Sequence, residues 1–213
     1  MGLVLLAGSA LYPSARWLLI WAGISFGSVA LGYAGIGPRV FGKTSSGRIP
    51  LALKILNLPY LAYTWFVWHL VRLLSREAAF NKIDDDLVIG RRLLASEAPD
   101  GFDHYVDLTA EFEEPAPIRI RPSYRCLPIL DASVPTIEEL RGAVETSASG
   151  RTFVHCAQGH GRTGLFALAL LLRRGSVQTI EEGVGLLRSL RPAVRLNREQ
   201  VKFAHRYLKT NVE

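Results

Sequence analysis

The stretch from Phe153 to Gly164, FVHCAQGHGRTG, constrains the fold of this chain more than any other. The apolar run Thr152 to Val154 predicts a strand that ends near Cys156, and the apolar pattern after Thr163 predicts a helix. A loop between a strand and the N-terminus of a helix turns its backbone N–H groups inward, which makes it an anion site. We therefore expect a phosphate-binding loop with Cys156 at its base.

The residue types in this loop indicate its chemistry. The helix N-terminus and Arg162 both favour the thiolate form of Cys156, and a thiolate facing a bound phosphate can accept a phosphoryl group. The planar fork of Arg162 matches two phosphate oxygens. We expect Gly159 and Gly161 to supply positive φ angles, and Thr163 to hydrogen-bond the Cys156 sulfur. The alternative is a buried core cysteine beside an ordinary loop.

The loop resembles the signature loop of the cysteine-dependent protein tyrosine phosphatase superfamily, in its compact dual-specificity branch. His155-Cys156 and Arg162-Thr163-Gly164 carry this resemblance. Further segments are similar to dual-specificity phosphatases related to the mitochondrial phosphatidylglycerophosphate phosphatase, a group that includes membrane-anchored bacterial proteins. These segments are Asn81–Asp84, Val88–Gly90, Val106–Thr109, Glu111–Phe112 and Tyr124–Pro128. The resemblance covers roughly Phe80 to Leu208.

The resemblance implies a phosphoric monoester hydrolase that needs no cofactor and no metal. Its phosphate-binding residues would be Ala157, Gln158, Gly159, His160, Gly161 and Arg162. It also implies that the ring of His155 orients the cysteine by bonding neighbouring backbone, although a plain strand residue is the alternative. Phosphoinositide phosphatases share a similar loop ending but usually carry lysines in the loop. Ala157 and Gln158 therefore make a highly charged inositol polyphosphate a poorer substrate.

A phosphatase of this kind needs a general acid to protonate the leaving oxygen. Asp131 directly follows the segment Arg125–Leu130, and the family places its acid on the corresponding loop. Asp131 is therefore the predicted acid, unless it only starts the turn before Pro135. Asp107 and Glu111 are the alternatives, and Asp107 has the flanking residues of a structural strand position.

Four other residues keep two interpretations each. His160 either contacts substrate or points into solvent. Cys126 is either a small core residue or a redox partner that forms a disulfide with Cys156. Asn197 and Gln200 either cap the last helix or also bear on the attacking water.

The last two thirds of the chain alternate strand and helix patterns, which predicts a small, mainly parallel α/β sheet flanked by helices. Capping residues mark three helix starts: Thr136 with Glu139, Thr179 with Glu182, and Asn197. The predicted strands are Leu87–Ile89, Tyr105–Leu108, Tyr124–Ile129 and Thr152–Val154, and a helix is predicted over Thr163–Arg173. The sequence contains no recognisable cluster of metal ligands.

The first third of the chain has a different composition. No Asp or Glu precedes Glu77, and all four tryptophans lie in this part of a chain whose net charge is +6. Trp17 to Gly37 is uncharged and apolar over about 20 residues, enough to cross a bilayer. Ile49 to Leu74 contains Lys54, Pro59 and His69, so it either spans or lies in the interface.

We therefore predict a membrane anchor over residues 1–76 and a catalytic domain over residues 77–213. Leu3 to Leu11 is short for a span, and with the next segment it favours a tight hairpin from Leu3 to Gly37. A cleaved signal peptide and a buried helical hairpin in a soluble protein are the alternatives. Basic residues flank the second segment on both sides, which favours a cytoplasmic catalytic domain if that segment lies in the interface. A cysteine that must stay reduced agrees with this location.

The sequence points to a phosphate monoester as substrate but does not identify it. The short connection between anchor and catalytic domain favours a lipid phosphate at the bilayer surface, phosphatidylglycerophosphate first, over a phosphoprotein. Five basic residues could hold the domain against anionic lipid headgroups, and the alternative is that they form a solvated basic face. They are Arg91, Arg92, Arg119, Arg121 and Arg125. We expect no nucleic-acid partner. A phosphate-binding pseudophosphatase and a rhodanese-like sulfurtransferase are the alternatives from other classes.

Overall fold

The computed structural model describes residues 1–210, without the side chains of residues 9–11 and 13. The chain divides into two compact units. The first comprises Met1–Thr44, Arg48–Arg76 and Ala110–Glu113, and we call it the helical unit. The second comprises Ser45–Gly47, Glu77–Thr109 and the chain from Glu114 onward, and we call it the sheet unit.

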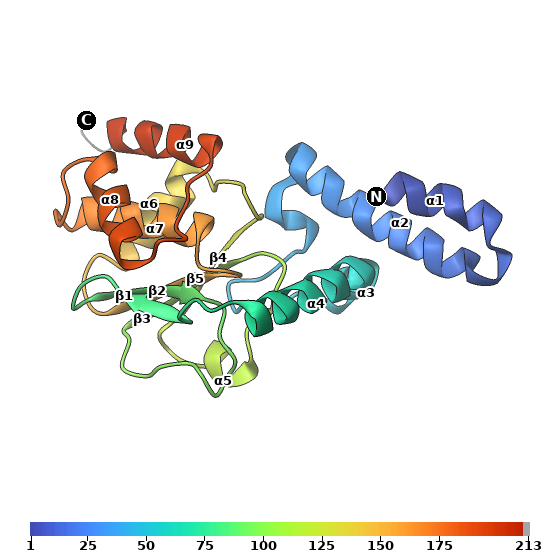
Figure 1. Ribbon diagram of the computed structural model, residues 1–213, viewed down its shortest axis with the longest axis horizontal. Helices are drawn as coiled ribbons and strands as arrows, with labels where there is room; N and C mark the ends of the chain where they lie inside the picture. The colour runs from blue at the N-terminus through green and yellow to red at the C-terminus, as the bar shows by residue number, and fades with distance from the viewer. Residues whose placement is uncertain (211–213) are drawn as a thin grey trace. The chain divides into compact units, whose positions relative to one another are not determined.

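The sheet unit is built on a five-stranded sheet with the order β1-β2-β5-β3-β4 (Figure 1). β1 is antiparallel to β2 and the other neighbours are parallel, so the predicted, mainly parallel sheet is confirmed. The strands are β1 (Phe80–Lys82), β2 (Leu87–Arg91), β3 (His104–Thr109), β4 (Tyr124–Ile129) and β5 (Thr152–Cys156). β1 was not predicted, because three residues with two polar side chains carry no strand pattern.

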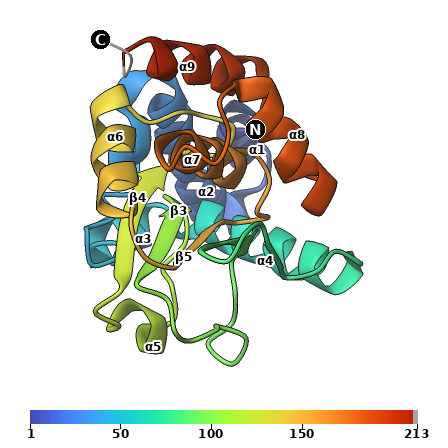
Figure 2. The ribbon, with the colours of Figure 1, turned by 90° about the vertical axis from the view of Figure 1, so that its left-hand side faces the viewer.

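Helices cover both faces of this sheet unequally. Figures 1 and 2 show α6 (Ile137–Thr146), α7 (Gly161–Arg173), α8 (Ile180–Leu190) and α9 (Arg198–Lys209) together on one face, and the short α5 (Ala116–Arg119) toward the other. The predicted caps are confirmed: the side chains of Thr136, Thr179 and Asn197 each accept from a backbone N–H of the first turn. α7 starts two residues before Thr163.

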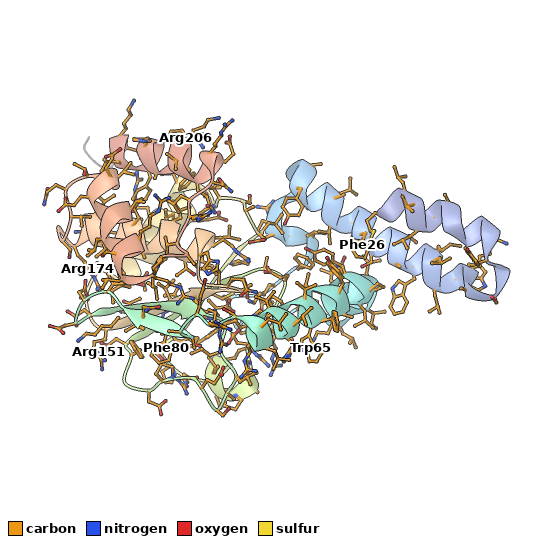
Figure 3. All side chains as sticks on the ribbon, viewed as in Figure 1. Phe26, Trp65, Phe80, Arg151, Arg174 and Arg206 are labelled. Atoms are coloured by element: carbon orange, nitrogen blue, oxygen red, sulfur yellow. The ribbon has the colours of Figure 1, made fainter. Side chains whose placement is uncertain are left out.

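Alternation along β5 divides its side chains between two cores. Val154 and Cys156 belong to the large core with α7, whereas Phe153 lies in the smaller core on the opposite face. Phe153 stacks on Tyr105 at 4.8 Å between ring centroids and meets the edge of Phe80, which is labelled in Figure 3, at 6.0 Å. Aromatic pairs at these distances stabilise beyond the area they bury, so β5 is fixed from both faces.

The helical unit begins with a hairpin. α1 (Gly2–Leu11) and α2 (Arg16–Leu31) lie side by side (Figure 1), joined through the short η1 (Pro13–Ala15). α2 continues through η2 (Gly32–Ile36) and η3 (Gly37–Val40). Arg16–Val40 is the one stretch of the described chain that is long and apolar enough to cross a membrane, with a mean hydropathy of 1.6 over 18 residues.

The second apolar segment is divided into α3 (Leu51–Leu56) and α4 (Leu58–Leu74) by Asn57. Asn57 is fully buried; its Nδ2 donates to the carbonyls of Leu53 and Val40, and its Oδ1 accepts from the Ser28 hydroxyl. Phe26 of α2, labelled in Figure 3, packs in a T-shaped arrangement with the ring of Tyr60 at 5.5 Å between ring centroids. α4 has 17 residues, fewer than the roughly 20 that a span requires.

Glu113 brings a carboxylate to this acid-free helical region. It lies in the Ala110–Glu113 segment of the helical unit and pairs with Lys54 at 2.7 Å. Its other oxygen accepts from the backbone N–H of Ile49 at 2.6 Å. Lys54 is the charged residue that made Ile49 to Leu74 a weaker candidate for a membrane span. Its charge is paired with Glu113 inside the helical unit.

Candidate active site

The phosphate loop, residues Cys156–Arg162, joins the central strand β5 to α7. β5 is buried throughout, and Cys156 is its last residue, only 3% exposed. α7 is buried over most of its length, so the N-terminus of a core helix faces the loop. Unsatisfied N–H groups at such a terminus are the anion site that the sequence predicts.

Gly159 gives the loop its tight turn. Its φ is +76°, and a Cβ built there would come within 2.3 Å of the carbonyl oxygen of Gly90 on β2. The backbone N–H of Gly159 donates to the Cys156 sulfur at 3.2 Å, so an amide of the loop faces the predicted nucleophile. Gly159 is therefore required by both its conformation and its close approach to β2.

Two expectations for the loop were wrong. Gly161 does not have a positive φ, because it already begins α7; the space beside it is instead taken by Gln200, whose Oε1 would lie 3.0 Å from an added Cβ. The hydroxyl of Thr163 is buried but makes no hydrogen bond within residues 1–210, so its predicted bond to sulfur is not formed. The Gly159 N–H contacts that sulfur instead.

Arg162 and Asp131 are brought together. The guanidinium of Arg162, 2% exposed, donates through Nη1 to the carbonyl of Ile129 at 2.9 Å. Its Nη2 lies 3.1 Å from Oδ1 of Asp131, whose side chain is 72% exposed. The carboxylate at the end of β4 therefore reaches the arginine of the loop while keeping access to solvent.

The Asp131 segment is held by the start of α9. Ala132 has a φ of +55°, which is unfavourable for a residue with a Cβ. Asn197 donates through Nδ2 to the carbonyl of Ala132 at 2.7 Å, and Gln200 donates through Nε2 to that of Ser133 at 3.3 Å. Besides forming the predicted cap, Asn197 and Gln200 thus support the loop that carries Asp131.

His155 lies on the face of the sheet opposite Cys156. It is fully buried against the rings of Tyr105 and Phe153. One potential ligand atom from each of His155, Asp107 and Glu114 lies within 4.8 Å of the others, a group that the sequence did not reveal because its members are far apart in the chain.

This buried group is hydrogen-bonded from two sides. Arg92 pairs with Glu114 at 2.7 Å, and the Tyr124 hydroxyl donates to Asp107 at 2.7 Å. Burial, and next the charge of Asp107, raise the pKa of Tyr124, so that hydroxyl remains a donor. Asp107 also accepts from Thr109, which gives it a structural place rather than that of a general acid. These carboxylates are therefore already engaged by protein donors.

The other candidates are placed as follows. His160 contacts Glu77: its Nε2 lies 2.8 Å from Oε2 of Glu77, and its side chain is 34% exposed. Glu111 belongs to the helical unit and accepts from the backbone N–H of Ala110. Ala157 and Gln158 are half-buried in the loop.

Cys126 is not placed to form a disulfide with Cys156. β3 lies between β4 and β5, and Cys126, Asp107 and His155 stand at the same level of the sheet. Two strand spacings, about 10 Å, exceed the roughly 7 Å that a disulfide tolerates between Cα atoms. Cys126 instead lines a cavity of about 360 Å³ that β4 and α6 share.

The predicted basic group is largely paired. Arg92 is buried in its ion pair with Glu114, so it is not available to lipid headgroups. Arg91 pairs with Glu97 at 3.2 Å. The expectation that these arginines form one open basic face is therefore wrong at Arg92, because its guanidinium is buried against the carboxylate of Glu114.

Arg191 contacts the phosphate loop, a position that the sequence does not predict. It is 3% exposed and donates to the backbone of the phosphate loop. An arginine between a helix and a proline has the pattern of a surface residue, and no local signal distinguishes it.

Comparisons with known proteins agree with this geometry. The family model for protein-tyrosine phosphatase matches residues 127–210. The structure of human DUSP28 aligns with a TM-score of 0.54 at 16% identity, covering 64% of this chain and 97% of that one. PTPMT1 in complex with PI(5)P aligns with a TM-score of 0.56 at 14% identity, covering 63% and 97%. Among curated proteins, none matches the chain.

The fold of the sheet unit is thus that of the solved dual-specificity phosphatases, and its loop carries the predicted Cys156 and Arg162. Residues 127–210 match the protein-tyrosine phosphatase family, and together with the fold this match supports a phosphoric monoester hydrolase of the cysteine-dependent superfamily.

Gly159→Ala should lower kcat/KM on an aryl phosphate by about 10²-fold, because the new Cβ collides with the backbone of Gly90 and displaces the loop. Gly175→Ala is the matched control: Gly175 also has a positive φ, +71°, but nothing lies within 4 Å of its Cβ position. It should lose stability and keep turnover. Equal kcat/KM losses in both variants would contradict the steric account.

Proposed function

We propose that this protein is a membrane-anchored phosphatase that hydrolyses a lipid phosphate monoester, phosphatidylglycerophosphate first, through a cysteinyl-phosphate intermediate. The observation that carries the proposal is the convergence of Cys156, Arg162 and Asp131 at one end of the sheet. Cys156 is the nucleophile, Arg162 binds the phosphoryl oxygens and Asp131 is the general acid.

The reaction has two steps. The Cys156 thiolate attacks phosphorus, the P–O bond to the alcohol breaks, and Asp131 gives its proton to the leaving oxygen. A water molecule then attacks the phosphorus, Asp131 takes its proton, and the S–P bond breaks to release inorganic phosphate and the thiolate. The inward N–H groups of the loop and the fork of Arg162 stabilise the charge on the equatorial oxygens in both transition states.

Cys156→Ser should abolish turnover while inorganic phosphate still binds, because the backbone and Arg162 form the anion site. Arg162→Lys should also be nearly inactive, because a single ammonium cannot replace a bidentate fork. Steady-state kinetics and calorimetric titration with phosphate check both. Turnover of Cys156→Ser at the wild-type rate would exclude the thiolate mechanism.

Asp131→Asn should lower kcat by roughly 10²–10⁴-fold on alkyl or lipid phosphates, since the leaving alkoxide then lacks its proton donor. The loss should shrink on aryl phosphates whose leaving groups are acidic, and this ratio is the quantity to measure. An equal loss on both substrates would instead assign Asp131 a structural role.

Two observations support a lipid substrate. The helical unit contains the apolar stretch Arg16–Val40, and Glu77 of the sheet unit directly follows Arg76, so a membrane anchor in the helical unit would keep the catalytic domain at a membrane surface. One solved structure of this fold, PTPMT1, is a complex with PI(5)P, a phospholipid. The fold therefore accommodates a phosphorylated lipid.

A phosphate-release panel tests the substrate with the full chain in anionic vesicles. We expect a higher kcat/KM on lipid phosphates than on phosphotyrosine peptides; the reverse order would make the protein a phosphoprotein phosphatase. Ile24→Arg should weaken membrane association and lower lipid turnover only, because a charge within a span costs about 2.5–3.5 kcal/mol. Ile120→Arg, at an exposed position of the sheet unit, is the matched control and should leave both unchanged.

A further inference from the structure

Arg191 lies outside the phosphate loop but bonds its backbone at two successive residues. Its Nη2 donates to the carbonyl of Gln158 at 3.1 Å, and its Nε donates to the carbonyl of Gly159 at 3.0 Å. Both carbonyl groups therefore point away from the anion site. In a trans peptide the N–H points opposite to the C=O, so the following N–H groups point toward the site.

One of these peptide groups connects Arg191 to the nucleophile. The peptide group that contains the Gln158 carbonyl also contains the Gly159 N–H, which donates to the Cys156 sulfur at 3.2 Å. The guanidinium bonds one end of this rigid plane and the sulfur bonds the other. The orientation of a hydrogen-bond donor to the nucleophile thus depends on a side chain that touches neither the sulfur nor the bound phosphate.

Arg191 is in turn held by the first residues of the sheet unit. Its Nη1 donates to the carbonyl of Ala78 at 3.0 Å and to Oδ1 of Asn81 at 2.7 Å. Oε2 of Glu77 lies 3.6 Å from Nη2 and 2.8 Å from Nε2 of His160, so one carboxylate joins Arg191 to the loop itself. Burial lowers the pKa of the Arg191 guanidinium, and the charge of Glu77 opposes that shift.

We propose that Arg191 and Glu77 are positioning residues for the phosphatase reaction: Arg191 aims the Gly159 N–H at the Cys156 sulfur, and Glu77 holds Arg191 and His160 in register. The inference rests on the proposed function, since it names what shapes that site. Glu77 directly follows Arg76, the last residue of this part of the helical unit. The segment that follows the last apolar helix therefore supplies the carboxylate that contacts Arg191 and His160.

The test uses the full-length protein and the variants Arg191→Lys, Glu77→Gln and their double variant. Lysine keeps the charge but has no fork to bond two carbonyl groups. We expect Arg191→Lys to raise KM and weaken calorimetric binding of inorganic phosphate about tenfold each, as lost charge-assisted hydrogen bonds predict. Its kcat should also fall about tenfold. A residue that only stabilises the fold would lower the active fraction and leave KM and phosphate affinity unchanged.

Glu77→Gln should show a smaller change of the same kind, and its effect should nearly vanish in the Arg191→Lys background because the two act through one contact. Glu145→Gln breaks an exposed ion pair with Arg173 and is the matched control, with no expected change. Should Arg191→Lys fail to fold, Glu77→Gln, whose side chain is 43% exposed, decides alone. Wild-type KM and phosphate affinity in the folded variants would overturn the inference.

The same measurements distinguish failure of the proposed function from failure of the positioning roles. If the wild-type protein turns over no phosphate monoester, the enzyme assignment fails, while phosphate binding by the variants still decides whether Arg191 shapes the loop. If the wild-type protein is active and the variants equal it, only the positioning roles fail.

Discussion

The structure of the site depends on where the carbonyl groups of one short loop point. When the N–H groups of the backbone between Cys156 and Arg162 face a phosphate, the carbonyl groups of the same trans peptides point away from it. The backbone N–H of Arg92 bonds the carbonyl of Ala157 at 3.2 Å, and Arg191 bonds the next two. Buried backbone groups without partners are costly, so these donors stabilise the loop as well as shape it.

The rest of the sheet unit places the chemistry around that loop. β5 is fixed between β2 and β3 and places Cys156 at the C-terminal end of the parallel strands, while β4 ends where Asp131 can reach Arg162. The start of α9 holds the Asp131 segment at Ala132 despite its unfavourable φ. The proposed nucleophile and the proposed acid thus lie at or just after the ends of β5 and β4, and parallel pairing of both strands with β3 brings these ends to the same side of the sheet as the phosphate loop.

The sequence predicted those features of the site that depend on residues close together in the chain. The strand before Cys156, the caps at Thr136 and Asn197, and the carboxylate after β4 all follow from residues within a few positions of one another. The roles of Arg191 and Glu77 could not be predicted in this way, because their partners are dozens of residues distant and surface-like patterns surround both. The sheet order that separates Cys126 from Cys156 likewise depends on long-range pairing.

The central claim is that Cys156 carries the phosphoryl group during turnover. The most direct measurement is acid quenching of the enzyme during hydrolysis of an aryl phosphate, followed by mass spectrometry of its peptides. The Asp131→Asn variant, whose kcat should fall less on an aryl phosphate than on a lipid phosphate, is quenched and analysed in the same way. The account predicts one added phosphoryl group on the peptide that contains Cys156, and none on Cys156→Ser. Turnover without that adduct, or with the phosphoryl group on another residue, would contradict it.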